Sequence, residues 1–236
     1  MSKLQKNTAP ITEAQNTTDE VLFDLEEQAV KIKSFWEHYG KNIAIVVGVI
    51  SAAILLYFAY KIFIVDANDK VAQEKIFMAE RAFEQDSFAL ALAGQQGSYA
   101  GMNEIIKKYG GTPTGNLAKF YVGIAALQSG SFDDAIKNLK DFSGKGDIIP
   151  ALALGALGDA YSEKNDMESA LKYYKQAADH DDNMFTAPLF LWKTGMLLDH
   201  QGKTAEALEL FKKIKKDFPL SLQGKDIDVD IARLSK

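Results

Sequence analysis

The sequence predicts an all-α protein in which a single transmembrane helix is followed by an α-solenoid of helical hairpins. Two observations carry this prediction. Residues Asn42 to Tyr60 form an uncharged, almost wholly apolar run. In the chain that follows, small residues recur at the fixed spacings of a helix-pair repeat. We therefore expect one membrane anchor, residues 41–65, and one helical domain, residues 66–236.

The apolar run has the length of a membrane span. At about 1.5 Å per residue it reaches roughly the 30 Å of a bilayer's hydrocarbon core. Lys41 and Lys61 bracket it, and Ile62 to Val65 extend it beyond Lys61, whose aliphatic stem can reach toward the headgroups. The run lies about forty residues into the chain, and no small-residue cleavage pattern follows it. This favours an uncleaved anchor over a secretory signal, and the alternative is a buried core helix.

Within the anchor, Ala44, Gly48 and Ala52 recur every four residues. Small residues at this spacing let a neighbouring transmembrane helix approach closely, so the three form a candidate packing stripe. Glycine and alanine are common in membrane helices, and a stripe without a packing role is the alternative. The lipid bilayer is the partner that the anchor itself predicts.

The segment before the anchor divides into a polar tail and an amphipathic helix. Residues 1–18 are rich in Asn, Thr, Gln and Ser and are expected to be disordered. Residues 19–40 carry apolar side chains at alternating steps of three and four, which predicts a juxtamembrane helix with one apolar stripe. The candidate docking residues are Leu22, Leu25, Ile32, Phe35, Trp36 and Tyr39. They dock on a partner or the membrane surface in one interpretation, and only position the anchor in the other.

Composition argues against nucleic-acid binding and catalysis. The net charge is −5, and no basic stripe stands out, because acidic residues flank the four lysines between 212 and 216. The absence of cysteine removes disulfides, thiol catalysis and zinc–thiolate sites. His38, His180 and His200 are isolated, and the chain has no phosphate loop or nucleophile motif. We therefore expect no enzyme activity, cofactor, metal or nucleic acid.

An internal repeat follows the anchor. Gly123, Gly158 and Gly195 each precede an alanine by twelve residues and a turn residue by seven, and the units are offset by 35 and 37 residues. The turn residues are Gly130, Asn165 and Gly202, and the alanines are Ala135, Ala170 and Ala207. Small residues where paired helices touch, with large ones between them, resemble the tetratricopeptide repeat.

This pattern divides residues 66–236 into units. We expect repeats at about 117–149, 151–184 and 188–220, a divergent helix pair at 66–110 and a cap helix at 225–235. Within the divergent unit, residues 66–93 are expected to form one long helix, followed by a glycine-rich turn and a short helix near 99–109.

The first helix of each repeat is expected to line a concave groove. The groove positions are Phe120, Ile124, Leu127, Asp159, Ser162, Trp192, Met196 and Asp199. Apolar and aromatic groups around a few polar ones suit an extended or helical polypeptide better than a charged metabolite. The alternative is that the cap helix or the long first helix fills this groove as ordinary core.

The junction from Glu26 to Lys41 resembles the YfgM family. A short stretch that ends in two aromatic residues and a glycine–lysine turn runs directly into the span, here as Phe35-Trp36 and Gly40-Lys41. The order of tail, single span and tetratricopeptide-like repeats also matches. The polar tail before Val21 is longer than in the shorter family members. The resemblance therefore implies nothing about a function of this tail.

The resemblance implies a bacterial inner-membrane protein with a cytoplasmic amino terminus and a periplasmic repeat domain. Lysines near the span are balanced on its two sides, so charge alone leaves the orientation open. The resemblance further implies an ancillary subunit of the SecYEG translocon that pairs with a PpiD-like periplasmic chaperone. Emerging secretory or outer-membrane proteins would be its unfolded clients.

The leading hypothesis is therefore a non-catalytic, translocon-associated scaffold with a chaperone-like binding groove. A second hypothesis is a cytoplasm-facing repeat receptor, or regulatory tether, that binds a signalling protein. An accessory subunit of an enzyme is a third possibility, and no particular residue supports it. Protease protection of the repeat domain separates the first two hypotheses, because they place it on opposite sides of the membrane.

Overall fold

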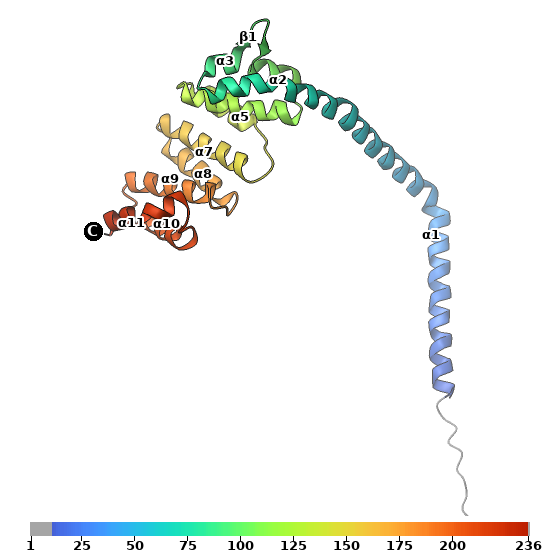
Figure 1. Cartoon of the computed structure of the whole chain (residues 1–236). Coiled ribbons are helices and arrows are strands. Elements are labelled where there is room, and N and C mark those ends of the chain that lie inside the picture. Colours follow the sequence, from blue (N-terminus) through green and yellow to red (C-terminus); the bar gives the residue numbers. More distant parts are fainter. Residues whose placement is uncertain (1–10, 236) are drawn as a thin grey trace, which may run out of the picture. The chain divides into compact units, whose positions relative to one another are not determined.

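The structure is a computed structural model that describes residues 11–235, with side chains from residue 30 onward except at positions 31 and 34. It is predominantly helical (Figure 1) and confirms the predicted all-α class, with a long apolar helix and a domain of helical repeats. The chain forms two units, of which one ends at Lys61 and the other begins at Ile62.

The described part of the first unit is one continuous helix, α1 (Ile11–Tyr60), and the π-helical segment η1 (Lys61–Asp66) runs across the boundary between the units. The helix therefore begins inside the stretch that was expected to be a disordered tail, while residues 1–10 lie outside the description. The juxtamembrane and anchor segments are not separate helices. Gly40 continues the helix, and the Trp36 ring covers it, so that an added Cβ would lie 3.3 Å from Trp36 Nε1.

The second unit begins with an irregular hairpin of helices. Helix α2 (Ala67–Glu84) is followed by the short α3 (Phe88–Ala93), so the long helix expected over 66–93 is broken at 85–87. Strands β1 (Gly94–Gln95) and β2 (Tyr99–Ala100) then pair antiparallel, with Gly94 opposite Ala100. Helix α4 (Met102–Tyr109) completes this part. The hairpin replaces the glycine-rich turn that the sequence predicted.

Three regular helix pairs and a last helix follow. They are α5 (Pro113–Gln128) with α6 (Phe132–Asp141), α7 (Ile148–Glu163) with α8 (Met167–Asp179), α9 (Thr186–His200) with α10 (Thr204–Asp217), and α11 (Leu222–Leu234). In Figure 1 these pairs follow one another in chain order from green to red, as in a solenoid.

The same turn joins the two helices of each pair. Gly130, Asn165 and Gly202 have φ of 75°, 61° and 76°, the left-handed conformation that glycine and asparagine tolerate best. The residue after each turn residue donates its N–H to the carbonyl five positions earlier, at 2.8 to 2.9 Å. Asp86, between α2 and α3, has φ of 56° and the same hydrogen bond, Ser87 N to Ala82 O at 2.9 Å.

The repeat glycines are required because the paired helices touch there. A Cβ built on Gly158 would lie 2.4 Å from a Tyr174 ring carbon, and one on Gly195 would lie 2.4 Å from a Phe211 ring carbon. At Gly123 the corresponding neighbour is Leu139, at 2.5 Å. In all three pairs the large residue stands sixteen positions after the glycine. A large side chain of the second helix therefore fills the space that each glycine leaves.

The core runs along the solenoid as three successive clusters. One is centred on α2, α4 and α5, one on α5 to α7, and one on α7 to α11. Many buried positions are alanines, and four of them have no exposed surface: Ala79, Ala135, Ala170 and Ala207. Small buried residues bring the helix axes close, and this stacking positions the first helices α5, α7 and α9 beside one another.

Candidate binding groove

The first helices of neighbouring repeats contact each other directly. A Cβ built on Gly155 of α7 would lie 1.9 Å from the ring of Phe190 on α9, so this glycine receives the phenylalanine ring. One turn further along, Asp159 of α7 pairs with Lys193 of α9. Residues 34 to 35 positions apart thus face each other, which sets the register of the groove.

Asp159 is the polar centre of the second repeat. Its carboxylate accepts a hydrogen bond from the Tyr174 hydroxyl at 2.6 Å and contacts Lys193 Nζ at 2.6 and 2.8 Å. The Lys193 ammonium also lies 5.6 Å from the centre of the Tyr174 ring, within cation–π range. Burial, and then the neighbouring Asp159 charge, raise the pKa of Tyr174 well above its ordinary value. The tyrosine is therefore a neutral hydrogen-bond donor.

An open hollow of about 410 Å³ lies between α5 and α7. It is lined by Leu127, Gln128, Gly130, Phe132, Asp159, Ser162, Glu163 and Tyr174. Three predicted groove residues, Leu127, Asp159 and Ser162, meet here. The exposed lining of the hollow is mostly polar, with carboxylate and hydroxyl groups beside apolar Leu127 and Phe132, and it suits a polypeptide segment that brings N–H donors.

Sequence reasoning missed several members of this lining. Gln128 comes four residues after the predicted groove residue Ile124, and Glu163 four residues after Asp159, so the helical spacing could have found them. Phe132 comes from the start of α6, and only the folded turn at Gly130 brings it to the hollow.

Phe120 and Ile124, unlike Leu127, do not line the hollow. Like Leu127, both are half-buried and pack against the core cluster between the first and second repeats. The Phe120 ring lies 5.7 Å from the Phe142 ring, at the end of α6. Phe120 and Ile124 contribute to the core that joins the two repeats.

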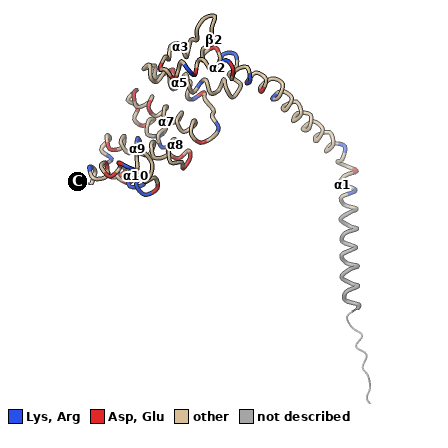
Figure 2. Tube along the Cα trace, in the orientation of Figure 1, with Lys and Arg blue, Asp and Glu red and all other residues tan. Residues whose placement is uncertain are grey.

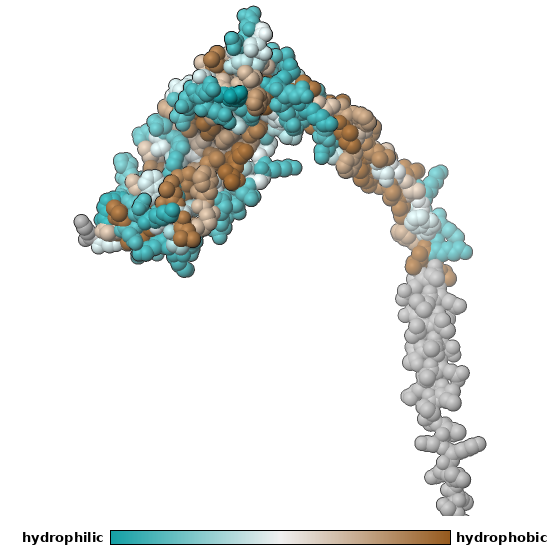
Figure 3. All heavy atoms as spheres, in the orientation of Figure 1, coloured by the Kyte–Doolittle hydropathy of each residue, from teal (hydrophilic) through white to brown (hydrophobic). Residues whose placement is uncertain are grey.

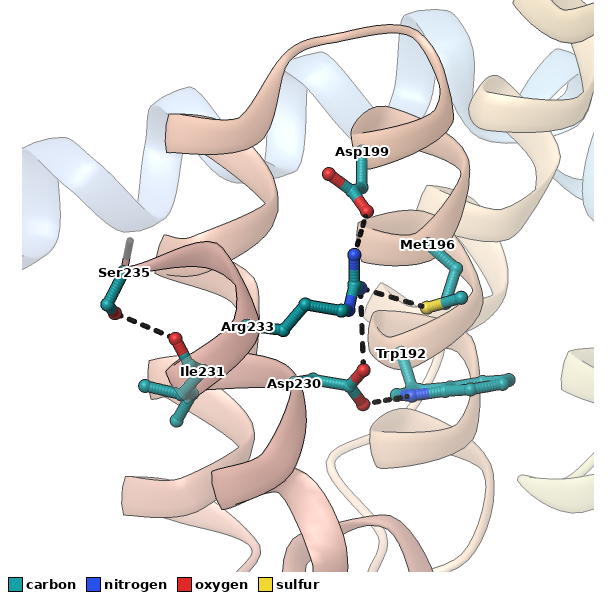
Figure 4. A network of polar contacts seen from close by, with 7 residues as sticks. All are labelled: Trp192, Met196, Asp199, Asp230, Ile231, Arg233 and Ser235. Carbon is teal, nitrogen blue, oxygen red and sulfur yellow. Dashed lines mark hydrogen bonds and ion pairs between the residues drawn. The ribbon is translucent and has the colours of Figure 1, made fainter.

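At the third repeat the groove is covered by α11 (Figure 4). Trp192 donates its indole N–H to Asp230 at 3.0 Å, and Arg233 donates to Asp199 at 2.6 Å. The same guanidinium reaches Met196 Sδ at 4.0 Å. The last helix therefore contacts three predicted groove residues, Trp192, Met196 and Asp199. At this end the groove is filled by the protein itself, as the alternative hypothesis expected.

Helix α11 occupies the place of a further first helix. Ile227 is 1% exposed, and Ile231 and Leu234 pack against the same cluster. The pairs Asp159–Lys193 and Asp199–Arg233 both join residues 34 positions apart. The candidate groove is thus open between the first and second repeats and closed at the third.

In the first unit, the described candidate docking side chains are exposed. Ile32, Phe35, Trp36 and Tyr39 are 48% to 68% exposed, and the Phe35 and Tyr39 rings lie 5.1 Å apart. The side chains of Leu22 and Leu25 lie outside the described residues.

Helix α1 contains a stretch long and apolar enough to cross a membrane. The mean hydropathy of its most apolar window is 2.5, and none of that window is buried. Figure 2 shows the uncharged stretch of α1 in tan beyond the charged residues of the juxtamembrane part. A Cβ added at Gly48 meets no atom within 4 Å, and Ala44 and Ala52 are exposed on the same helix.

Among the described residues, no group of three or more histidine, cysteine or carboxylate side chains is placed to hold a metal ion. His180 contacts the carbonyl of Gly146 at 3.0 Å, and the ring of His38 lies against Tyr39. On the repeat domain, Figure 2 shows basic and acidic residues intermixed.

A comparison with protein families matches residues 33–207 to a tetratricopeptide repeat-like domain. The protein belongs to this family. Tetratricopeptide repeat-like domains act as scaffolds for protein–protein interaction and are typically non-catalytic. Its partners are therefore proteins. A comparison with curated proteins gives no significant match.

The family match begins at residue 33 and so includes the apolar part of α1 as well as the repeats as far as Ala207. It covers the two repeats that form the open hollow and the first half of the third. The glycines and turn residues that predicted the repeat all lie within the matched range.

Proposed function

We propose that this tetratricopeptide repeat-like protein is a membrane-anchored, non-catalytic scaffold that binds polypeptide segments in the groove between α5 and α7. The observation that carries the proposal is the open hollow of about 410 Å³ lined by Leu127, Phe132 and the carboxylate of Asp159. Lys193 and Tyr174 already donate hydrogen bonds to the Asp159 carboxylate. The carboxylate of Glu163, which also lines the hollow, is the one left to accept hydrogen bonds from a bound segment.

The anchor in this proposal is the apolar part of α1. Its exposure and hydropathy support a single bilayer span. Exposed Trp36 and Tyr39 stand just before it, where amphipathic rings favour the headgroup layer. The exposed juxtamembrane residues Ile32 and Phe35 would contact either the membrane surface or a membrane partner.

The more specific assignment rests on the juxtamembrane resemblance of Phe35-Trp36 and Gly40-Lys41 to the YfgM family. On this basis we place the anchor in the bacterial inner membrane beside the SecYEG translocon, with the repeat domain in the periplasm. The groove would then receive a PpiD-like chaperone or an emerging secretory or outer-membrane client. The small-residue stripe of α1 would contact a translocon helix.

The topology is tested first. Protease is added to spheroplasts of a cell that produces the full chain with epitopes at both ends. Digestion of the repeat domain without breach of the membrane supports the periplasmic assignment. Protection of this domain until the membrane is opened overturns it and favours the cytoplasm-facing receptor.

The groove is tested by photo-cross-linking in the full chain. A photoreactive residue at Gln128 faces the hollow, and one at the exposed Lys137 on α6 serves as the matched control. We expect capture of a periplasmic chaperone or a secretory client from position 128 only, with loss of capture when Ser162→Trp fills the hollow. Capture that is equal from both positions, or of cytosolic proteins only, overturns the proposal.

A further inference from the structure

Exposed apolar side chains precede α9 in a loop that hydrogen bonds hold in place. Phe185 is 61% exposed and Met184 is 46% exposed. The side-chain oxygen Oδ1 of Asn183 accepts hydrogen bonds from the backbone N–H groups of Phe185 at 2.9 Å and Thr186 at 2.7 Å. The Asn183 amide donates to the Thr186 hydroxyl at 2.6 Å and to Asp181 at 3.1 Å. The loop therefore presents an aromatic ring to solvent in a fixed conformation.

A second exposed apolar pair lies at the start of the neighbouring first helix. Ile148 is 48% exposed and Ile149 is 39% exposed at the beginning of α7. Because Gly155 of α7 packs on Phe190 of α9, the starts of α7 and α9 lie at the same edge of the solenoid.

The two preceding loops are also in contact, through His180 Nε2 and the carbonyl of Gly146 at 3.0 Å. We call Ile148, Ile149, Met184 and Phe185 the apolar ridge. Figure 3 shows apolar side chains gathered on one face of the repeat domain, over the region of α7 to α9. None of the four belongs to the described core clusters, so helix packing does not account for them.

Acidic residues surround the ridge. Asp147, Asp179 and Asp182 are exposed and Asp181 is half-buried, whereas Lys145 is the single lysine or arginine of the described loops 142–147 and 180–185, and His180 is their one histidine. An apolar patch with a charged rim of one sign is typical of a protein interaction site and selects partners of the opposite charge.

We propose that the apolar ridge docks a basic amphipathic segment of a partner protein, with aliphatic side chains on one face and lysine or arginine at its edges. The rim repels anionic lipid headgroups, and two ridges brought together would oppose like charges, so the charge disfavours a membrane or a second copy as occupant. The ridge lies at the loop edge and not in the groove, and this proposal does not depend on the proposed function of the groove.

The test uses the full chain in nanodiscs of phosphatidylcholine, with empty nanodiscs as background. The probe is a fluorescein-labelled helical peptide with leucines on one face and lysines on the other, and its leucine–glutamate counterpart is the comparison. We expect saturable binding of the lysine peptide, weakened by about tenfold or more in Ile149→Ser/Phe185→Ser. Asp179→Asn/Asp182→Asn should weaken it as well and reduce its salt dependence.

Two control variants separate the sites. Leu222→Ser changes a 76% exposed leucine on α11 and should leave peptide binding unchanged, as should the groove variant Ser162→Trp. Unchanged circular dichroism and melting temperature establish that the ridge variant is folded. Equal binding of both peptides, or undiminished binding by the ridge variant, overturns the proposal. A concentration-dependent dimer that is lost in Ile149→Ser/Phe185→Ser also overturns it, in favour of a second copy.

Discussion

Lys193 on α9 holds Asp159 on α7 through both carboxylate oxygens, at 2.6 and 2.8 Å, while the Tyr174 hydroxyl donates to the same carboxylate at 2.6 Å. Arg233 on α11 donates to one carboxylate oxygen of Asp199 on α9, at 2.6 Å. Each ion pair joins one first helix to the next. The two pairs therefore fix the register of the concave face from the second repeat to the end of the solenoid.

Removal of the Asp159 carboxylate should destabilise the repeat domain. Asp159→Ala leaves the Lys193 ammonium and the Tyr174 hydroxyl without their shared acceptor, at an expected cost of about 1–3 kcal/mol in the free energy of unfolding. This cost is measured by chemical denaturation of the full chain in detergent, with circular dichroism as the readout. Asp133→Ala is the control, because the Asp133–Lys164 pair is exposed and its loss should cost less than about 1 kcal/mol. Equal costs for the two variants would contradict the central role of Asp159.

Gly158→Ala should destabilise the domain through a steric clash. The added methyl would lie 2.4 Å from the Tyr174 ring, which forces the helices of the second repeat apart, at a cost of about 1–3 kcal/mol. Gly111→Ala is the control for composition, since nothing lies within 4 Å of its Cβ and its φ is not in the left-handed region. Gly202→Ala isolates backbone strain, because its φ is 76° and its Cβ meets nothing, and should cost about 1 kcal/mol. Similar thermal stabilities for Gly158→Ala and Gly111→Ala would refute the packing explanation.

Asp69 should make stability depend on pH in the acid range. Burial opposes its ionisation, but hydrogen bonds from the Thr114 N–H at 2.8 Å, the Thr114 hydroxyl and Gln73 hold the pKa of Asp69 below its ordinary value. A carboxyl with a lowered folded-state pKa stabilises the fold above the unfolded-state pKa of about 3.9, and this contribution is lost as the pH falls through the folded value.

The corresponding measurement is the difference in unfolding free energy between the wild type and Asp69→Asn as a function of pH. We expect about 1–2 kcal/mol at neutral pH and a difference that shrinks toward zero below about pH 3.9. The exposed Asp226→Asn is the control and should show little effect at any pH. If the difference in unfolding free energy between the wild type and Asp69→Asn stays constant down to strongly acid pH, the ionised carboxylate of Asp69 is not the source of the stabilisation.

Loosening of α11 should uncover the third-repeat end of the groove. Ile227 is 1% exposed, and Ile227→Ala should cost about 2–4 kcal/mol, largely in the docking of this helix. Trp192 then loses Asp230 and meets water, so its fluorescence emission should shift to the red. The other tryptophan is Trp36, and a Trp36→Phe background leaves a single reporter. Val229→Ala, at a 73% exposed position on the same helix, should leave the emission unchanged. No shift in Ile227→Ala would mean that α11 does not shield Trp192.

The regular repeats were predictable because the helical hairpin constrains its own sequence. Gly123, Gly158 and Gly195 are required wherever two helices touch, and Gly130 and Gly202 occupy left-handed turns that few residues adopt. These requirements are local in sequence and recur with the repeat. The divergent unit was harder to predict, because the left-handed residue between α2 and α3 is Asp86 and the turn contains no glycine or proline.

A signal for that break was nevertheless present. Ala79, Asp86 and Ala91 have the spacing of seven and twelve residues that marks the other repeats. Ala79 stands where the regular repeats have a glycine and Ala91 where they have a buried alanine, and both are fully buried. The hairpin of β1 and β2 that follows has no counterpart in the other repeats, and nothing in the repeat spacing predicts it.

The groove residues illustrate the limit of the helical pattern. Helical spacing placed Leu127, Ser162 and Trp192 on equivalent faces of their helices, and it was silent on which of these faces stays open. Trp192 is covered because Asp230 and Arg233 of α11 reach it and its neighbour Asp199. Leu127 and Ser162 line the hollow between α5 and α7, where no further helix packs in the described part of the domain.

The sequence by itself determined an apolar helix of membrane length and a helical repeat, because hydrophobic length and close helix contacts are properties of short stretches of chain. Only the tertiary structure decided that α11 closes one end of the groove while the hollow beside Asp159 stays open. That outcome depends on contacts between residues 34 to 38 positions apart, such as Asp199 with Arg233 and Trp192 with Asp230. Their meeting is set by how the repeats stack, which no single repeat encodes.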